Sequence, residues 1–531
     1  MPCPIIQDSA FLILRALIEK NDASRYDAFV MNNENKQLKY GAVISYIAIF
    51  INTLTALFYL PWMARKLGQS HYALYNLAFS FVNFFLVDFG LSMAVSRFAA
   101  KYRAEENETK TNTLVGIITK LYLAIDAVIL VVMVVVYFFI DVIYKGLTPE
   151  EIAVFKPLYL IMAGYSILSF PFMSLNGILT AYEKFVALKL CDLGQKLLTV
   201  FLIIFGLRTG HGVVFLITAN VIGGALALIV KLIIVKTETP IVPDFKTEDS
   251  EILKGVLSFS IWTAVVSITQ RFVFTLAPTI LGMVSNSREI ALFSPANSLE
   301  GYFYMFAAAV NGLFLARISR YIARNEEDKL FDLMVNVGRY QMVVMGLIFI
   351  GFLCIGREFM SLWMGPEYQD AAFCAILMFI PDLLLFTQQI ANDTVIAKNE
   401  VKHYAYSNIG MAVICVVLSF ILARPLGALG SCIAIAVSYF FTFIYMNVVY
   451  YQKLNLDIFA FFRKCYGSFI LPYAITIAAS WFLLPFIHRG GWIGMGIKAL
   501  LITCIYAVSV WFLALTGEEK QILLGRIRKS N

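Results

Sequence analysis

The chain has 531 residues, of which 60% are hydrophobic and only 15% are charged. Soluble domains use about 45–50% apolar and about 25% charged residues, so this composition excludes an ordinary water-soluble fold. The net charge of +7 does not indicate a nucleic-acid-binding protein, because the basic residues are scattered over many short connections. The eight cysteines form no CxxC pair, so neither a disulfide framework, a zinc site nor a haem attachment is indicated.

Long apolar runs recur along the chain from Tyr40 to Leu515. A helix needs about 20 mainly apolar residues to cross the hydrocarbon of a bilayer, and runs of that length are separated here by short polar connections. The sequence therefore predicts an all-α polytopic membrane protein with about fourteen transmembrane helices. These predicted segments, numbered 1 to 14, cover residues 41–63, 73–96, 114–140, 158–181, 187–206, 212–235, 255–281, 289–315, 332–355, 372–396, 405–423, 426–450, 466–487 and 492–515.

The Lys and Arg residues of the connections indicate the orientation. They concentrate near both termini and in alternate connections, whereas the remaining connections hold few of them. Because cytoplasmic loops retain positive charge, we expect both termini in the cytoplasm. No cleavable signal peptide is evident before segment 1, and Met31 offers an alternative start.

An internal repeat relates the first six segments to the next six. Gly41 and Gly68 bracket segment 1 with the same spacing as Gly255 and Gly282 bracket segment 7, and ALYNLAFS of segment 2 matches ALFSPANS of segment 8. Because each half holds an even number of spans, the two pseudo-symmetric six-helix lobes are related by an axis along the membrane normal, with a central site between them. The predicted parts are a cytoplasmic tail (1–39), an N-lobe (40–236), a cytoplasmic linker (237–254), a C-lobe (255–450), an appended helix pair (466–515) and a cytoplasmic tail (516–531).

Two stretches resemble a known family. LGQSHYALYNLAFSFVNFFLVDFGLSMAVSRFAAKY, over residues 67–102, resembles the start of the polysaccharide transport family, the Wzx-like oligosaccharide flippases. FMSLWMGPEYQDA, which begins at Phe359, is similar to the family's pattern before segment 10. The resemblance implies the multidrug/oligosaccharidyl-lipid/polysaccharide exporter superfamily and a V-shaped fold of two lobes. It also implies a flippase that moves undecaprenyl-diphosphate-linked oligosaccharide from the cytoplasmic to the outer leaflet of the bacterial inner membrane.

Three basic residues inside predicted segments are candidates for binding the substrate diphosphate. An ionisable residue at the centre of a membrane helix costs about 2.5–3.5 kcal/mol on insertion scales, so each is a functional hypothesis. Arg271 lies deep in segment 7, its repeat equivalent is uncharged, and a guanidinium can hold a diphosphate through two parallel hydrogen bonds. The alternative for Arg271 is a structural ion pair with a carboxylate of segment 8 or 10. Lys120 and Arg339 are repeat equivalents of one another, and extension to the membrane surface explains them equally well.

Two further ionisable residues have simpler interpretations. Lys196 lies four residues after Asp192 on segment 5, a spacing that predicts a one-turn salt bridge. Asp88, in the sequence DFGL, is expected to cap or orient a loop.

Polar residues form stripes on three predicted helices, because spacings of three, four and seven residues place side chains on one helical face. Such stripes either bond helix to helix or line a wet cavity that a sugar can enter, and their occurrence on repeat-related segments 2 and 8 favours the cavity. The expected lining residues are Asn76, Ser80, Asn83, Asn297, Glu300, Tyr304, Asn311 and Gln389.

Carboxylates in the C-lobe suggest ion coupling. Glu300 of segment 8, and Asp382 and Asp393 of segment 10, could exchange H⁺ or Na⁺ as the lobes move, or could pair with Arg271. Pro381 directly precedes Asp382 and can break the helix at that depth.

We therefore expect a transporter that works by alternating access and is not an enzyme, with no cofactor or metal beyond coupling to H⁺ or Na⁺. The expected partners are a lipid-linked oligosaccharide, membrane lipid and polysaccharide assembly machinery, and no nucleic acid. One alternative is a cation-coupled multidrug antiporter of the same superfamily, whose cavity should hold carboxylates and aromatic residues. The other is a membrane-embedded glycan polymerase or glycosyltransferase, which would need catalytic carboxylates or a large outer loop that this sequence does not show.

Overall fold

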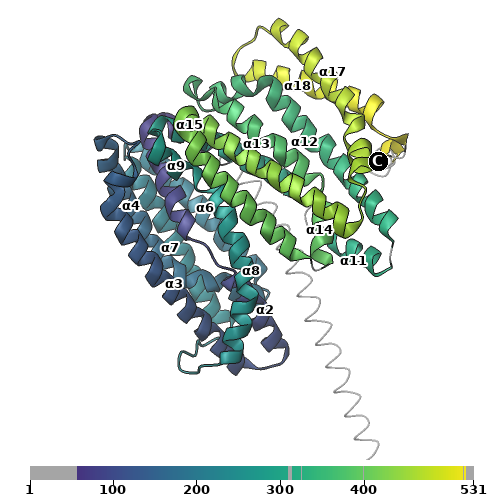
Figure 1. Cartoon of the computed structure of the whole chain (residues 1–531). Helices are drawn as coiled ribbons and strands as arrows, with labels where there is room; N and C mark the ends of the chain where they lie inside the picture. The colour runs from purple at the N-terminus through teal and green to yellow at the C-terminus, as the bar shows by residue number, and fades with distance from the viewer. Residues whose placement is uncertain are drawn as a thin grey trace, which may run out of the picture.

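The computed structural model describes residues 55–521, except residues 56, 309–313, 325, 399 and 518. Within these residues the chain is helical and contains no β-strand (Figure 1). It begins with helical residues 57–85, which change direction at Gly68. The elements that follow are α2 (Leu91–Ala104), α3 (Glu108–Ile143), α4 (Pro149–Ser169), η1 (Phe170–Met173), α5 (Ser174–Ala181), α6 (Phe185–Arg208), α7 (Val213–Glu238), α8 (Ser250–Phe274), α9 (Ala277–Val284), α10 (Ser287–Ala308), α11 (Leu315–Ala323), α12 (Glu327–Trp363), η2 (Pro366–Tyr368), α13 (Ala371–Phe386), α14 (Gln389–Ala397), α15 (Val401–Leu454), α16 (Ile458–Cys465), α17 (Gly467–Leu483), η3 (Leu484–Phe486), α18 (Gly491–Ser509) and η4 (Val510–Ala514).

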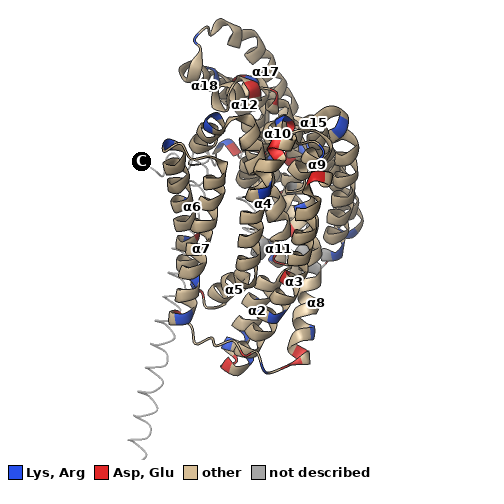
Figure 2. Ribbon diagram, turned by 90° about the vertical axis from the view of Figure 1, so that its left-hand side faces the viewer, with Lys and Arg blue, Asp and Glu red and all other residues tan. Residues whose placement is uncertain are grey.

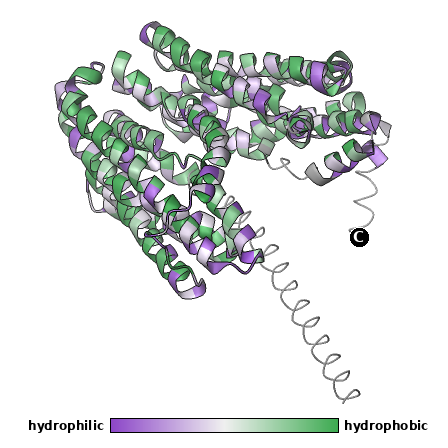
Figure 3. Ribbon diagram, turned by 60° about the horizontal axis from the view of Figure 1, so that its bottom comes forward, coloured by the Kyte–Doolittle hydropathy of each residue, from purple (hydrophilic) through white to green (hydrophobic). Residues whose placement is uncertain are grey.

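The helices carry apolar side chains on their outer surfaces. On α3, Leu123, Val128 and Phe138 are 51%, 64% and 73% exposed. Figure 3 shows hydrophobic residues along most of the length of the helices, and Figure 2 shows charged residues gathered mainly toward helix ends. An apolar surface of this extent is stable against lipid and not against water, so the predicted polytopic membrane fold is confirmed.

Nine helices of the described chain are long and apolar enough to cross a membrane, or up to ten when the bent pair α13 and α14 counts as one span. The helix α15 contains two predicted segments, because Gly427 interrupts it with φ 57° and ψ −133°. Glycine reaches this backbone conformation at little cost, and Glu289 Oε2 accepts a hydrogen bond from the next amide, Ala428 N, at 2.8 Å. Most of segment 1 and residues 309–313 of segment 8 lie outside the described residues, and segment 2 is divided into shorter helices. The count of fourteen therefore stays a prediction.

The helices form two lobes and an appended pair. The N-lobe runs from residues 57–85 to α7, the C-lobe runs from α8 to α15, and α17 and α18 pack beside α12. In Figure 1 the C-lobe helices from α11 to α15 diverge from the N-lobe on going away from α9, which gives the V shape that the family resemblance implies, whereas α8 stays beside α2.

One set of contacts between the lobes lies at one end of the molecule, here called the closed end, whereas α8 contacts α2 toward the other end. Arg65 Nη2 donates to the carbonyl of Leu362 at 2.8 Å, and Trp363 Nε1 donates to the carbonyl of Leu57 at 2.6 Å. These bonds join the N-lobe to the last turn of α12. The closed end consists of residues 57–72, 144–151, 279–287 and 362–368.

A second set of contacts at the closed end joins α4 to α9 and α10. Gly146 N donates to the carbonyl of Gly282 at 3.1 Å. The Glu151 carboxylate accepts from Ser70 Oγ at 2.7 Å and also bonds Ser287 at the start of α10. One carboxylate at the start of α4 therefore connects both lobes.

Segment 10 is bent inside the C-lobe, but not at its proline. The helix α13 continues through Pro381 to Phe386, and α14 leaves it at an angle of 56°. The bend falls at residues 387–388, where the Gln388 and Asn447 side chains exchange hydrogen bonds of 2.7 and 3.1 Å. The expectation that Pro381 breaks the helix is therefore wrong. This amide pair stabilises the polar break against α15.

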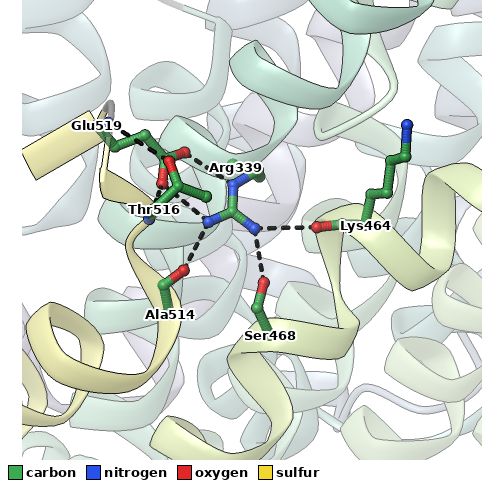
Figure 4. A network of polar contacts seen from close by, with 6 residues as sticks. All are labelled: Arg339, Lys464, Ser468, Ala514, Thr516 and Glu519. Carbon is green, nitrogen blue, oxygen red and sulfur yellow. Dashed lines mark hydrogen bonds and ion pairs between the residues drawn. The ribbon is translucent and has the colours of Figure 1, made fainter.

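Arg339 of α12 fastens the C-terminal end of the appended pair (Figure 4). Its Nε and Nη2 donate to the Glu519 carboxylate at 2.8 and 2.9 Å. Its Nη1 donates to Lys464 O at 2.9 Å and to Ser468 Oγ at 2.6 Å, and Nη2 also donates to Ala514 O at 2.7 Å. All five guanidinium donors are thus used.

A second ion pair holds the other end of the pair. Lys498 Nζ of α18 lies 2.6 Å from Glu358 Oε2 of α12. Glu358 is about 28 Å from Arg339 along the helix, at a rise of 1.5 Å per residue. The appended pair is therefore fixed to α12 at two distant points and has to move with the C-lobe.

The Arg339–Glu519 clamp makes a testable contribution to stability. Arg339→Met should lower the free energy of unfolding by about 3–5 kcal/mol, because Glu519 would be left buried without its partner. The double variant Arg339→Met, Glu519→Leu should recover most of that loss, because apolar replacement of a buried ion pair is often neutral. Thermal unfolding of the purified chain in detergent measures both. A double variant as unstable as the single variant would contradict this account.

The same clamp should weaken in acid. Burial opposes ionisation of Glu519, but hydrogen bonds from Arg339 and Thr516 outweigh it and hold the pKa of Glu519 below its ordinary value of 4.5. A lowered pKa stabilises the fold above the unfolded-state pKa, and this stability is lost as the pH falls through the folded-state pKa. The melting temperature of the wild-type chain should therefore fall more steeply below pH 4.5 than that of the double variant. Equal slopes would show that Glu519 is not ionised in the fold.

Candidate functional site

The main candidate site lies where a broken helix of each lobe meets the other. Helical residues 57–85 end in a non-helical stretch at 86–90, and α8 ends at Phe274 before α9 begins. The Ser80 hydroxyl of the N-lobe donates to the carbonyl of Thr275 in the gap between α8 and α9. A backbone that leaves the helix at membrane depth needs partners from the protein, and here one lobe supplies a partner to the other.

The turn before α2 brings α8 close to the N-lobe. Gly90 has φ 74°, and a Cβ there would lie 2.6 Å from the side chain of Thr263, so both the turn and the close approach require glycine. Asp88 accepts hydrogen bonds from Ser92 N at 3.2 Å and from the Tyr122 hydroxyl. The expectation that Asp88 caps and orients this loop is confirmed.

Arg271 lies beside both breaks. Its Nη2 donates to the carbonyl of Leu86 at 3.4 Å, a long hydrogen bond, and no carboxylate pairs with it among the described residues. The expected alternative partners, Glu300 and Asp382, contact one another instead. A partly buried guanidinium therefore retains unused donors at the junction of the lobes.

Two of the three polar residues in the stripe of segment 2 form hydrogen bonds with backbone carbonyls. Asn76 Nδ2 donates to the carbonyl of Tyr72, one turn back, at 2.8 Å. Asn83, and Asn297 on α10, are partly exposed, whereas Asn311 lies outside the described residues. Of the predicted N-lobe lining, Asn83 is the side chain for which the structure shows no hydrogen bond within the part of the chain that it describes.

A polar cavity of about 340 Å³ lies inside the C-lobe, between α10, α13, α14 and α15. Three of the predicted residues line it, together with polar residues that sequence reasoning missed. The polar groups include Tyr304, Asp382 and Gln389, which were predicted, and Gln270, Tyr404 and Asn408, which were not. Tyr404 and Asn408 are spaced by four residues on α15, and this spacing was the available signal.

Two carboxyl groups meet at this cavity. Glu300 and Asp382 are only 4% and 1% exposed, and their carboxyl groups bond one another. Two carboxyl groups can share a hydrogen bond only when one of them carries a proton. Asp393 is held separately, because its Oδ1 accepts from Gln389 Nε2 at 2.9 Å.

Lys120 is partly buried on α3, beside the linker between the lobes. Hydrogen bonds from Thr247 and Lys246, with a smaller contribution from the charge of Lys120, lower the pKa of Asp244 in that linker. Asp244 N in turn donates to the carbonyl of Asn112 at 3.1 Å. Lys120 therefore has an acidic neighbour in this structure.

The salt bridge predicted on segment 5 is wrong. Asp192 Oδ1 accepts from Lys231 Nζ of α7 at 2.8 Å, and Lys231 also donates to Asn176 Oδ1 at 3.0 Å. Lys196 instead lies with Nζ 6.0 Å from the centre of the Tyr59 ring. A local spacing rule could not reveal this, because Lys231 is 39 positions from Asp192.

Two further residues change the expected set. The prediction that Arg339 binds the diphosphate is wrong, because all five of its donors are occupied in the clamp described above. Asp126 of α3, which sequence reasoning missed, is 7% exposed, and its Oδ1 has no hydrogen-bond partner within the described chain.

Comparison with known proteins connects this fold to transporters. The chain is 22% identical over 197 residues to the probable low-salt glycan biosynthesis flippase Agl15 of Haloferax volcanii, which covers 37% of this chain and 41% of Agl15. The lipid II flippase MurJ, in an inward closed conformation, matches with a TM-score of 0.71 at 14% identity over 89% of this chain and 98% of MurJ. A multidrug resistance MATE family transporter of the MOP superfamily, in an inward-facing conformation, matches with a TM-score of 0.62 at 16% identity, over 77% and 97% of the two chains.

At these identities the solved structures show a shared fold, and the match to Agl15 spans less than half of either chain. The family assignment rests on a longer match. Residues 38–315, more than half of the chain, match the family described as polysaccharide biosynthesis protein. The chain therefore belongs to the polysaccharide biosynthesis protein family and has the two-lobed fold of the MOP-superfamily transporters.

Proposed function

We propose that this protein is a flippase that moves undecaprenyl-diphosphate-linked oligosaccharide from the cytoplasmic to the outer leaflet of the bacterial inner membrane. Family membership, the shared fold and the names of Agl15 and MurJ support a lipid-linked glycan substrate. The protein acts as a transporter and catalyses no covalent step. The observation that carries the proposal is Arg271, a membrane guanidinium with unused donors at the junction of the two lobes.

The chemistry of Arg271 suits a diphosphate. A guanidinium presents planar, parallel N–H groups that match two phosphate oxygens, and its charge persists when it is partly desolvated. In this structure Arg271 donates one long hydrogen bond, to the carbonyl oxygen of Leu86. An entering diphosphate would offer it shorter, charge-assisted bonds at a point where both lobes contribute backbone.

The arrangement of interlobe contacts supports alternating access. With both termini in the cytoplasm, as the loop charges predict, the closed end faces outward and the substrate enters from the cytoplasmic side. Release to the outer leaflet requires the closed end to open, so the bonds of Arg65, Trp363 and Glu151 across the lobes have to break.

The Glu300–Asp382 pair supports coupling to H⁺ or Na⁺. The shared proton can leave, or a small cation can replace it, as the cavity changes shape, and Asp393 lies further along the same bent segment. Binding at this pair would then bias the equilibrium between the two orientations of the lobes.

A cation-coupled multidrug antiporter is the second candidate. The observation that favours it is the C-lobe cavity, in which Asp382 lies among tyrosines that include Tyr304, Tyr404 and Tyr439. Such a protein would change the susceptibility of cells to cationic drugs and leave lipid-linked glycans unaffected, so both phenotypes should be measured together.

Deletion of the gene in its native host should cause a lipid-linked oligosaccharide to accumulate. The wild-type gene should restore export, whereas Arg271→Ala should reduce it roughly ten- to a hundredfold, the value of one charge-assisted hydrogen bond. Arg271→Lys should retain part of the activity, because lysine keeps the positive charge but lacks the planar guanidinium that binds two oxygens at once. Arg208→Ala, at the exposed end of α6, is the matched control.

Two outcomes decide between the parts of this proposal. If no lipid-linked oligosaccharide accumulates, the flippase assignment is wrong. If accumulation occurs and Arg271→Ala restores export fully, the flippase assignment stands and Arg271 is structural.

Glu300→Gln and Asp382→Asn should uncouple transport from the ion gradient. Each variant removes a group that exchanges the ion, so export should fall roughly ten- to a hundredfold, the usual range of coupling between two sites. Dissipating the proton or sodium gradient in wild-type cells should produce the same loss and should add nothing in the variants. Asp370→Asn serves as control, because Asp370 pairs with Arg357 on the exposed surface. Full activity of both variants would refute this coupling site.

A further inference from the structure

Lys196 is a membrane cation that pairs with no carboxylate among the residues that the structure describes. It lies about 17 Å from the start of α6 and about 18 Å from its end, at 1.5 Å per residue, and is therefore near mid-membrane. It is partly buried, and among the described residues its one recorded side-chain contact is the Tyr59 ring, 6.0 Å from Nζ. A charge at this depth is costly unless something binds it.

The other membrane cations described above show what a structural role looks like in this protein. Arg339 uses all five donors, Lys498 bonds Glu358 at 2.6 Å, and Lys231 bonds two oxygens. Asp192 lies one turn from Lys196 on the same helix, yet Lys231 takes it. Lys196 therefore has no ion pair with Asp192, although the two residues lie one turn apart on α6.

The surroundings of Lys196 connect it to the candidate site. Tyr59, beneath its ammonium group, is hydrogen-bonded to Tyr75, whose hydroxyl accepts from Asn220 Nδ2 of α7 at 3.0 Å. Tyr75 lies on the helical stretch 57–85. The residue that follows this stretch, Leu86, accepts the hydrogen bond from Arg271 described above.

Lys196 and Arg271 also lie at similar depths. Arg271 is about 20 Å from the closed-end terminus of α9, and Lys196 is about 18 Å from the end of α6 that points the same way. Residues 57–86 therefore contact two cations with unused donors, Lys196 of α6 beside Tyr59 and Arg271 of α8 at Leu86.

We propose that Lys196 is a second anion contact of this site and binds a phosphate group of a lipid-linked diphosphate from the N-lobe side. The proposal rests on the flippase function proposed above. An ammonium group offers three donors, and the Tyr59 ring stabilises its charge without consuming them. A phosphate that enters can bind Nζ directly, while Arg271 binds from α8.

The test uses the purified full-length chain in detergent, with inorganic pyrophosphate as the probe and the melting temperature as the readout. Pyrophosphate should stabilise the wild-type protein. Lys196→Met should weaken binding roughly ten- to a hundredfold, the value of one charge-assisted hydrogen bond, and Lys196→Arg should keep part of it. Lys236→Gln, at the exposed end of α7, should bind as the wild type does.

The melting temperature without pyrophosphate separates a binding role from a structural one. Removal of an unpaired charge from the membrane should leave Lys196→Met as stable as the wild type or more stable. A large loss of stability in Lys196→Met that Lys196→Arg does not rescue would overturn the proposal. So would unchanged binding of pyrophosphate by Lys196→Met, or no stabilisation of the wild-type protein.

A second probe, undecaprenyl diphosphate in the same detergent, identifies the source of the phosphate. Stabilisation by this lipid that depends on Lys196 supports the proposal, and stabilisation by pyrophosphate alone overturns it. The export assay keeps the two proposals apart. If Lys196→Met restores export fully while deletion causes the lipid-linked oligosaccharide to accumulate, Lys196 is not a contact and the flippase function stands. If no lipid-linked oligosaccharide accumulates on deletion, the flippase function is wrong, whether or not pyrophosphate stabilises the protein.

Discussion

A bilayer provides no water for a backbone that leaves the helix, so each interruption of a spanning helix has to be completed by the protein itself. In this protein two interruptions complete one another across the lobes. Ser80 donates a hydrogen bond to the carbonyl of Thr275 in the break at 275–276, and Arg271 donates one to the carbonyl of Leu86 in the break at 86–90. The bonds that satisfy the backbone are therefore also bonds between the parts that have to move. A substrate that replaces them does so at the point where the movement begins.

The general architecture could be read from the sequence because it depends on a local property. Whether a run of residues faces lipid follows from its hydropathy and length, so the long helices α3, α7 and α12 agree with predicted segments. The breaks were invisible for the same reason. The residues at 86–90 are as apolar as their neighbours apart from Asp88, and hydropathy carries no information about a left-handed φ.

The candidate site could be predicted only in part, because a partner for a charge is a property of the tertiary fold. The sequence singled out Arg271 as a candidate, but it could not distinguish Arg271 from Arg339, whose partner is 180 positions away. It also assigned Asp192 to Lys196 on spacing alone. A one-turn pair on an isolated helix is worth about 0.2–0.5 kcal/mol, and a buried contact with another helix easily exceeds that.

The distance in sequence between Arg339 and Glu519 has a consequence for how the protein is made. At about 5–20 residues per second, a ribosome needs roughly 10 to 40 seconds to synthesise the 180 residues that separate them. Throughout that interval α12 exists while the carboxylate that neutralises its arginine does not. Lipid phosphates and water at the membrane surface are the available substitutes for the nascent chain. Residues synthesised long after α12 thus complete the environment of this helix.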